Sequence, residues 1–284
     1  MSVLITVAGS VNLDFVASAP KLPRAGETVT GATLARHPGG KGANQALAAR
    51  RLGADVRLHA NVGADALAGE ALALLRAEGV DLSACRADPN HPTGVALIAV
   101  SPDGENQIVV APGANAAFTP DLLEGPIEGA LICQLELPAE TVAKALALAQ
   151  GFACVNLAPA RPASEMVLER ADLIVVNETE AAHYGDWLNG AQGLVAVTWG
   201  AKGAGLYRGA ELIARAEPPK VDVVDSTGAG DAFVAALTVA LVEGREPEGA
   251  LAFACTAGAL AATRPGAQPS LPTRAEVEAR RVRG

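Results

Sequence analysis

Short hydrophobic runs alternate with helical patterns along most of the chain. The runs are rich in branched aliphatic residues and predict buried β-strands at residues 3–8, 56–62, 131–134, 153–156, 171–176 and 194–198. Helical patterns stand between or after them, at residues 43–52, 63–77, from 141 onward and at 248–262. Repeated strand–helix units predict a parallel sheet with helices on both faces, and such sheets bind ligands at the carboxyl ends of their strands.

Two segments interrupt this alternation. Residues 93–100 and 107–110 predict a β-hairpin, because a turn rich in proline and glycine separates two apolar runs. Together with residues 14–37, the hairpin is expected to form a small sheet over the ligand site at the carboxyl ends of the strands. We therefore predict one α/β domain over residues 1–284, a three-layer α/β/α fold with a mainly parallel central sheet. A small β-sheet lid, formed by about residues 14–37 and 92–112, is inserted in it.

A strand, a glycine turn and a helix are predicted in that order near the C-terminal end. Residues 221–224 predict a buried strand, and residues 232–237 predict a buried helix. The first turn of a helix has unpaired backbone N–H groups and carries roughly half a positive charge. Gly228 and Gly230 let the backbone approach a phosphate closely. This stretch therefore predicts an anion site.

Two carboxylates bracket that anion site. Asp231 lies in the first turn of the predicted helix, where it could cap the helix or take a proton from a hydroxyl placed beside the phosphate. Asp225 ends the predicted strand and could hold a cation. Two carboxylates beside an anion site need a positive ligand to be stable, which favours a functional interpretation over capping alone.

Polar residues also follow the first predicted strand. If residues 11–14 are extended, Asn12 and Asp14 point the same way, and an amide beside a carboxylate suits a polyol. A loop with an Asx turn explains the two residues equally well.

A second glycine turn precedes the helix predicted at residues 43–52. The run from Gly39 to Asn44 is not a Walker P-loop, because Lys41 is followed by glycine instead of serine or threonine. It is not a dinucleotide-binding turn either, because Gln45 stands where the third glycine belongs. A purely structural turn is possible, although the run has more converging polar groups than a turn needs.

Composition narrows the classes of function. The net charge of −9 argues against a nucleic-acid scaffold, so any bound phosphate must be held by local dipoles and a few basic groups. We find no apolar run long enough for a transmembrane helix, and the N-terminus has the pattern of a strand instead of a signal peptide. The four cysteines lie far apart without zinc spacing, which predicts buried free thiols in a reducing cytoplasm.

Eight motifs together resemble the ribokinase family of carbohydrate kinases along nearly the whole chain. They are GSVNLD at 9–14, GETVTG at 26–31, GGKGANQA at 39–46, APGANAA at 111–117, QLELP at 134–138, NETEA at 177–181, VDSTGAGDAF at 224–233 and TRPGAQPS at 263–270. The resemblance implies a ribokinase-like fold and ATP-dependent phosphorylation of the 5-hydroxyl of D-ribose, with Mg²⁺ and a monovalent cation, usually K⁺.

The resemblance also implies a role for each matching residue. Asp231 would be the general base, and the anion hole for the γ-phosphate would be Gly228, Ala229 and Gly230. The sugar would be held by Asn12, Asp14, Gly40, Lys41, Asn44, Glu136 and Asp231. Asn177 and Glu180 would orient Mg²⁺ through water. The nucleotide site would be lined by Thr198, Gly200, Lys202, Gly203, Gly230 and Cys255. The monovalent cation would lie at Asp225, Thr227, Ala261, Arg264, Gly266 and Ser270.

The chain departs from the family pattern at three places. Ser226 replaces the more usual threonine, and Cys255 stands where the family commonly has a polar histidine or asparagine near the adenine. The segment between Asn177 and Thr198 is shorter than in typical ribokinases and leaves room for a helix near residues 178–188 and little else.

Other functions remain open at this point. A nucleoside kinase would want aromatic stacking partners, yet aromatic residues are only 3% of the chain. A sugar-phosphate kinase would need extra cations in the lid, where Lys21, Arg24 and Arg36 are available. Other sugars or nucleosides, such as 2-deoxyribose, fructose or pseudouridine, would use the same mechanism. A non-catalytic sensor is disfavoured because Asp231 and the glycines are intact. The apolar hairpin strands predict a homodimer that forms through the lid.

Overall fold

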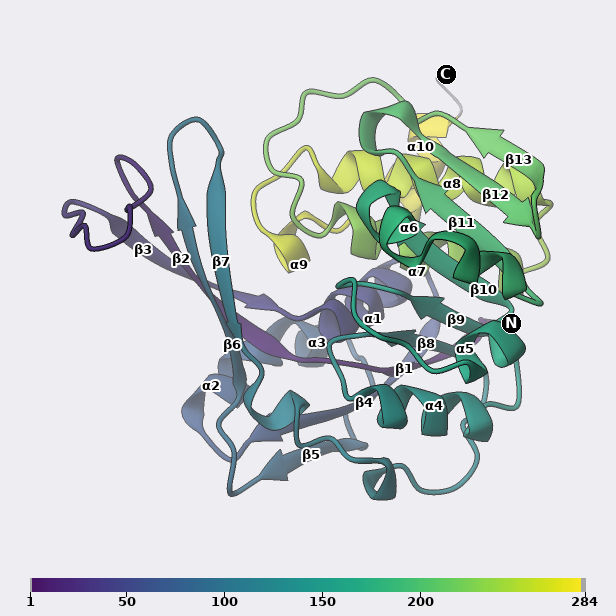
Figure 1. The fold of residues 1–284 in the computed structure, drawn as a ribbon, viewed down its shortest axis with the longest axis horizontal. Helices are drawn as coiled ribbons and strands as arrows, with labels where there is room; N and C mark the ends of the chain where they lie inside the picture. The colour runs from purple at the N-terminus through teal and green to yellow at the C-terminus, as the bar shows by residue number, and fades with distance from the viewer. Residues whose placement is uncertain (1, 282–284) are drawn as a thin grey trace.

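The chain folds around a central, mainly parallel β-sheet in a computed structural model that describes residues 2–281. The strands of this sheet are ordered β13-β12-β11-β10-β9-β8-β1-β4-β5 (Figure 1). Neighbours from β5 to β11 are parallel, and β12 and β13 extend the sheet antiparallel. Their bounds are β1 Leu4–Ala8, β4 Asp55–Gly63, β5 Cys85–Asp88, β8 Ala130–Gln134, β9 Ala153–Asn156, β10 Leu173–Asn177, β11 Leu194–Thr198, β12 Ala204–Arg208 and β13 Glu211–Ala216.

Helices cover both faces of this sheet, because side chains on a strand alternate between the faces. In β8, Ile132 belongs to one hydrophobic cluster, and its neighbours Leu131 and Cys133 belong to the other. The first cluster contains residues of α1 Lys41–Arg51, α2 Ala66–Ala71, α3 Ala73–Ala77, α7 Ala229–Val242, α8 Pro247–Ala261 and α10 Arg274–Arg281. The second contains residues of α4 Ala139–Leu148 and α5 Met166–Arg170, with α6 Glu178–Tyr184 packed against it. The predicted three-layer α/β/α fold is confirmed.

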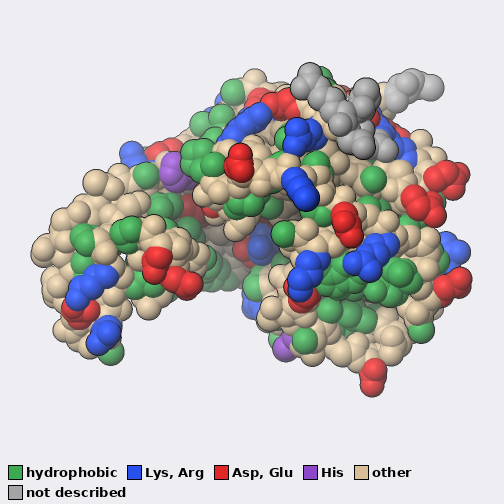
Figure 2. All heavy atoms as spheres, turned by 90° about the horizontal axis from the view of Figure 1, so that it is seen from above, with side chains coloured by type: hydrophobic (Ala, Val, Ile, Leu, Met, Phe, Trp, Pro, Cys, Tyr) green, Lys and Arg blue, Asp and Glu red, His purple; other side chains and the backbone are tan. Residues whose placement is uncertain are grey.

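A small separate sheet projects from the layered body (Figures 1 and 2). Its strand order is β3-β2-β6-β7, with β2 parallel to β6 and antiparallel to β3. The bounds are β2 Asn12–Ser18, β3 Thr33–Gly39, β6 Gly94–Val100 and β7 Asn106–Ala111. Figure 2 shows a recess between this sheet and the body, and charged side chains of both signs are visible in it.

Short helical turns complete the chain. They are η1 Gly113–Asn115, η2 Pro120–Leu122, η3 Gly185–Gly190, η4 Gly200–Lys202 and the one-turn helix α9 Ala267–Ser270. The α6–η3 segment fills the short connection between β10 and β11, where one helix was expected. Within residues 2–281, no helix combines the length and the apolar character needed to cross a membrane.

The predicted strand at residues 221–224 is wrong. The segment has no regular secondary structure, and Val223 and Val224 are 65% and 63% exposed. The N–H of Val224 donates to the carbonyl of Ala262 at 2.9 Å, at the C-terminal end of α8 instead of along a strand. β-Branched residues favour a strand only where a neighbouring strand is available. At the end of the glycine- and proline-rich run at residues 264–270, only residues 267–270 form a helix, α9.

Candidate active site

The candidate site lies where the N-termini of α1 and α7 meet the carboxyl end of β1. Both helices begin after a glycine with positive φ, Gly40 at 87° and Gly228 at 80°. A Cβ added to Gly42 would lie 2.5 Å from the Cα of Gly9, so α1 can start against the end of β1 only with glycine there. This close approach brings together the motifs at residues 9–14, 39–46 and 228–231, as the strand-end rule predicts.

The Asp231 carboxylate faces α1 and is 7% exposed. Its Oδ2 accepts a hydrogen bond from Asn44 Nδ2 at 2.8 Å, and its Oδ1 accepts one from Gln45 Nε2 at 2.9 Å. No side chain among the described residues caps the first turn of α7. Burial raises the pKa of Asp231, while Lys41 and the bonds from Asn44 and Gln45 act in the opposite direction. Helix capping therefore does not account for this carboxylate.

Three buried amides behind Asp231 were missed by the sequence analysis. Gln45 Nε2 also donates to Asn156 Oδ1 at 3.1 Å, and Gln45 Oε1 accepts from Gln134 Nε2 at 2.6 Å. Gln45 and Gln134 are fully buried, and Asn156 is 7% exposed. The available signal was a glutamine beside the alanine-rich run of this helix, because buried polar side chains need specific partners.

The polar residues expected to hold a sugar gather beside Asp231. Glu136 Oε2 accepts from Ser10 Oγ at 2.5 Å and from the backbone N–H of Lys41 at 3.0 Å. Burial first, and then the nearby Glu136 and Asp231 carboxylates, raise the pKa of Asp14 to about 7, although Lys41 acts in the opposite direction. Burial also opposes the Lys41 ammonium, but the surrounding carboxylates, Asp231 first, give it a raised pKa. One cation among these carboxylates leaves a site that suits hydroxyl donors.

Two asparagines at this end differ in whether the side-chain oxygen has a hydrogen-bond partner. Asn12 Oδ1 accepts from Asn115 Nδ2 at 2.8 Å, and Asn115 also bonds both backbone groups of Val11. Asn115, another residue that was missed, thereby fixes the start of β2. Asn44 Oδ1, in contrast, is buried without a hydrogen-bond partner among the described residues. Leaving a buried acceptor unpaired costs free energy, so a ligand that donates a hydrogen bond to Asn44 Oδ1 would be stabilised there.

A cavity of about 530 Å³ lies beyond the N-terminus of α7. Five of the six residues expected at the nucleotide line it: Thr198, Gly200, Gly203, Gly230 and Cys255. Lys202 is outside its lining. The wall also includes Pro218, Pro219, Val221 and Val223, from the segment that was predicted to be a strand. This wall is mostly apolar, as a purine base requires of a pocket.

Cys255 is held as a neutral thiol in this cavity. Its Sγ lies 3.7 Å from the carbonyl of Ala216, to which it donates. Burial raises its pKa to about 12. The thiol is therefore a small apolar group of the wall and not a nucleophile.

Asn177 and Glu180 form the capping box of α6. Asn177 Oδ1 accepts from the N–H of Glu180, and Glu180 Oε2 accepts from the N–H of Asn177, both at 2.8 Å. Burial raises the pKa of Glu180. These bonds leave Glu180 Oε1 outside the capping box, so the pair retains an oxygen for a further ligand.

The residues expected at a monovalent cation lie on the loop before α7 and on the adjoining segment from the end of α8 to α9. Asp225 accepts from the N–H and the Oγ1 of Thr227, at 2.9 and 2.6 Å, and from the N–H of Gly266 at 2.8 Å. Burial opposes ionisation of Asp225, but these bonds lower its pKa overall. The N–H of Arg264 donates to the carbonyl of Ala261 at 3.4 Å, and Ser270 Oγ bonds within α9. Such oxygens are ligands that hard cations prefer. Within residues 2–281, no group of three or more acidic, histidine or cysteine side chains is placed to hold a metal ion.

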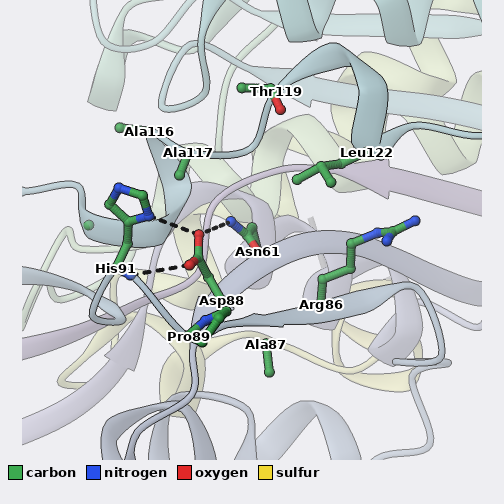
Figure 3. Close-up of a pocket in the computed structure, with 11 residues that line it drawn as sticks. Asn61, Arg86, Ala87, Asp88, Pro89, His91, Ala116, Ala117, Thr119 and Leu122 are labelled. Carbon is green, nitrogen blue, oxygen red and sulfur yellow. Dashed lines mark hydrogen bonds and ion pairs between the residues drawn. The ribbon is translucent and has the colours of Figure 1, made fainter.

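A larger cavity, of about 680 Å³, lies elsewhere, beside β5, η1 and η2 (Figure 3). In it, Asp88 Oδ2 is 2.9 Å from His91 Nδ1 and accepts from Asn61 Nδ2 at 3.2 Å. Bonds from Asn90 and His91 lower the pKa of Asp88 to about 2. None of the expected site residues lines this cavity, and its carboxylate is already satisfied, so it is not the candidate active site.

The chain is similar to known sugar kinases along nearly its whole length. Residues 3–274 match the pfkB family carbohydrate kinase. A ribokinase of Bacillus subtilis is 38% identical over 288 residues, which cover 96% of this chain and 98% of the relative. The crystal structure of a ribokinase from Thermotoga maritima has a TM-score of 0.87 and 32% identity, with 98% of each chain covered. A structure of Arabidopsis thaliana ribokinase complexed with ribose and ATP has a TM-score of 0.85 and 29% identity, again with 98% of each chain covered.

Proposed function

Because the chain belongs to the pfkB family of carbohydrate kinases, and is thus an ATP-dependent sugar kinase, we propose that it phosphorylates the 5-hydroxyl of D-ribose to D-ribose 5-phosphate. The observation that carries the choice of a free sugar is the cluster of polar side chains next to Asp231, which includes the unpaired buried Asn44 Oδ1. The named relatives are ribokinases, and one of them is complexed with ribose and ATP, which supports this choice.

The sugar is held by oriented polar groups. Asn12, Asp14, Gly40, Lys41, Asn44 and Glu136 supply a mixture of acceptors and donors for ring hydroxyls. A sugar hydroxyl donated to Asn44 Oδ1 would satisfy the buried acceptor that the free protein leaves unpaired. The carboxyl of Asp14, with a pKa of about 7, accepts sugar hydroxyls best when it is ionised.

Asp231 is the general base in this mechanism. It accepts the proton of the 5-hydroxyl as that oxygen attacks the γ-phosphorus, and the bond to the β-phosphate oxygen breaks in line. A strong base is not needed, because phosphoryl transfer depends mainly on alignment and on neutralising charge. The backbone N–H groups of Gly228, Ala229 and Gly230, at the N-terminus of α7, receive the charge that develops on the γ-phosphoryl oxygens.

ATP occupies the cavity beyond α7, with its base against the apolar wall and its phosphates toward Gly230. Asn177 and Glu180 are the residues that would hold Mg²⁺, through water and through the oxygen outside the capping box. Asp225, Thr227, Ala261, Arg264, Gly266 and Ser270 would hold the monovalent cation with carbonyl, hydroxyl and carboxylate oxygens. When bound, the two cations offset phosphate charge. Turnover is expected to fall when K⁺ is replaced by tetramethylammonium, and equal rates in the two buffers would remove the K⁺ site.

The small sheet acts as a lid and as a dimer interface in this proposal. Five of its large apolar side chains are about half or more exposed: Leu34, Leu97, Ile108, Val109 and Val110. By their register, Leu34, Leu97 and Val109 share one face of this sheet. Monomers rarely leave such a face uncovered, and a second copy packed on it would bury these side chains. Light scattering at micromolar concentration should give the mass of a dimer, and the mass of a monomer would contradict the interface. The four free cysteines suit work in the cytoplasm.

The test is ADP release with Mg-ATP and K⁺ over ribose, 2-deoxyribose, fructose, fructose 6-phosphate, adenosine, uridine and pseudouridine. Ribose should be the best acceptor. Asp231→Asn should abolish turnover, and the exposed Asp186→Asn is the matched control that should keep it. Turnover with another acceptor would support the same mechanism with a substrate other than ribose. A folded protein without turnover across the panel would point to an acceptor outside the panel or to a non-catalytic sensor.

A further inference from the structure

The buried amides behind Asp231 form a chain whose hydrogen-bond direction is fixed from one end. Asn156 Nδ2 donates to the backbone carbonyl of Val175 at 3.1 Å, and a carbonyl can only accept. Asn156 must therefore turn its Oδ1 toward Gln45, which donates to it at 3.1 Å. The same Gln45 nitrogen donates to Asp231 Oδ1 at 2.9 Å. The direction of every bond in the chain thus follows from one main-chain carbonyl on β10.

A second anchor holds Gln45 from the other side. Gln134 Nε2, at the end of β8, donates to Gln45 Oε1 at 2.6 Å. Gln45 then uses both N–H groups as donors and its oxygen as an acceptor, so an amide flip would break three bonds at once. Its side chain is fully buried, so water cannot replace the lost partners.

The chain of amides can only donate to Asp231. Gln45 reaches one carboxylate oxygen and Asn44 reaches the other, and in both cases the donor is an amide N–H. A protonated carboxyl would have to present its own O–H to one of these donors or turn it toward the sugar. The arrangement therefore stabilises the ionised carboxylate and holds its plane.

We propose that Gln45 is a positioning residue for phosphoryl transfer: anchored by Gln134 and Asn156, it fixes the plane of the Asp231 carboxylate and keeps it ionised to accept the proton of the sugar hydroxyl. This proposal rests on the proposed function, in which Asp231 is the base. Gln45 itself is too deeply buried to bind sugar or nucleotide. It acts only through Asp231.

Other charged groups also face Asp231 and contribute to its titration. Lys41 from α1 favours the ionised form, whereas Glu136, after β8, and Asp14, from β2, disfavour it. These groups are unchanged when Gln45 is replaced. A shift in the pKa of Asp231 that follows the replacement therefore reports the loss of the hydrogen bond from Gln45.

The test compares Gln45→Met, which keeps length and removes both donors, with Thr238→Val. Thr238 is also fully buried, on the same helix as Asp231, but its hydroxyl donates to the carbonyl of Val234 and faces the Cys154 thiol instead of Asp231. Gln45→Met should lower kcat by about 10- to 100-fold, the size expected for a lost hydrogen bond to a charged group. The KM for the sugar should stay within about threefold, and the acid limb of the rate profile should move up by about one pH unit. Thr238→Val should leave kcat, the KM for the sugar and the acid limb of the rate profile unchanged.

The neighbouring anchor gives a second readout. Gln134→Met should lower kcat less than Gln45→Met, and the double variant should be no slower than Gln45→Met alone, because Gln134 acts through Gln45. Additive losses would contradict the chain.

A measurement without turnover separates this proposal from the choice of substrate. Carboxyl ¹³C-labelled aspartate gives a titration curve for Asp231, whose signal is identified by its loss in Asp231→Asn. Gln45→Met should raise the pKa of Asp231, even if ribose proves to be the wrong sugar. An unchanged Asp231 titration, or a loss of rate that only parallels a fall in Tm without a shift of the acid limb, would overturn the role of Gln45. If Asp231→Asn keeps full turnover, the base assignment fails instead.

Discussion

The sugar end and the nucleotide end of the site are built by different physical means. At the sugar end, carboxylates and amides from several elements contact one another through directed hydrogen bonds, and the Lys41 ammonium lies among the carboxylates. At the nucleotide end, glycines, prolines and valines line a cavity of about 530 Å³ with few polar side chains. In the proposed function, we therefore expect the sugar end to select by the direction of its hydrogen bonds, and the nucleotide end by shape and apolar contact. Substitutions at the sugar end should have large and specific effects on activity, and substitutions at the nucleotide end should have smaller ones.

The largest effect is expected from Asn44→Ala. The change removes the donor to Asp231 Oδ2 and the unpaired Asn44 Oδ1 that we assign to the sugar. We expect kcat/KM for the sugar to fall by about 100- to 1000-fold, because two hydrogen bonds are lost, one of them to a charge. Steady-state kinetics with varied sugar and varied ATP measure it. An equal rise in the KM for ATP would show that the two ends are not independent.

A medium effect on stability is expected from Asp14→Asn. The folded pKa of about 7 exceeds the ordinary value of 3.8, so the folded state holds this proton longer than the unfolded state does. Stability contributed by Asp14 is therefore lost as the pH rises from about 4 to about 7. Burial also raises the pKa values of Asp231 and Glu180, which gives the wild type more slope of the same sign.

The measurement for Asp14 is Tm against pH in the absence of ligands. Between pH 5 and 8, the wild type should lose on the order of 5 °C more than Asp14→Asn does. Asp186→Asn, which changes an exposed aspartate, should follow the wild type. Parallel curves for all three proteins would mean that Asp14 ionises normally. The sugar end would then be less crowded with charge than its geometry indicates.

The smallest effect is expected from Val223→Ser at the nucleotide end. Val223 is 65% exposed in the free protein and lines the cavity, so it loses contact with water only when the base binds. Losing part of this burial should raise the KM for ATP by about three- to tenfold and leave the KM for the sugar unchanged. Val224→Ser, with similar exposure but outside the lining of this cavity, is the matched control. A much larger effect of Val223→Ser would show that the wall does more than exclude water.

Most of the candidate site could be predicted because its motifs are local. Glycines at helix starts and polar residues at strand ends follow from rules that act over a few residues. The structure places Asn12, Asp14, Lys41, Asn44 and Asp231, which the family resemblance grouped, at the same end of the sheet. The role of each residue stays a prediction. For Asn177 and Glu180, the local motif does not separate two roles, because the same side chains match a metal-binding motif and complete a helix cap.

The sequence alone determined the strand–helix alternation of the layered domain, the two glycine-bounded helix starts and the family. Hydrophobic periodicity and turn chemistry are written in neighbouring residues, so they can be read without the fold. Only the tertiary structure decided that Gln45 bonds Asp231, 186 positions away, and that Val223 lines a cavity instead of a strand pair. A buried amide or a β-branched side chain has no preferred partner of its own. Its partner is set by which distant segments the packed core brings within hydrogen-bond or van der Waals distance.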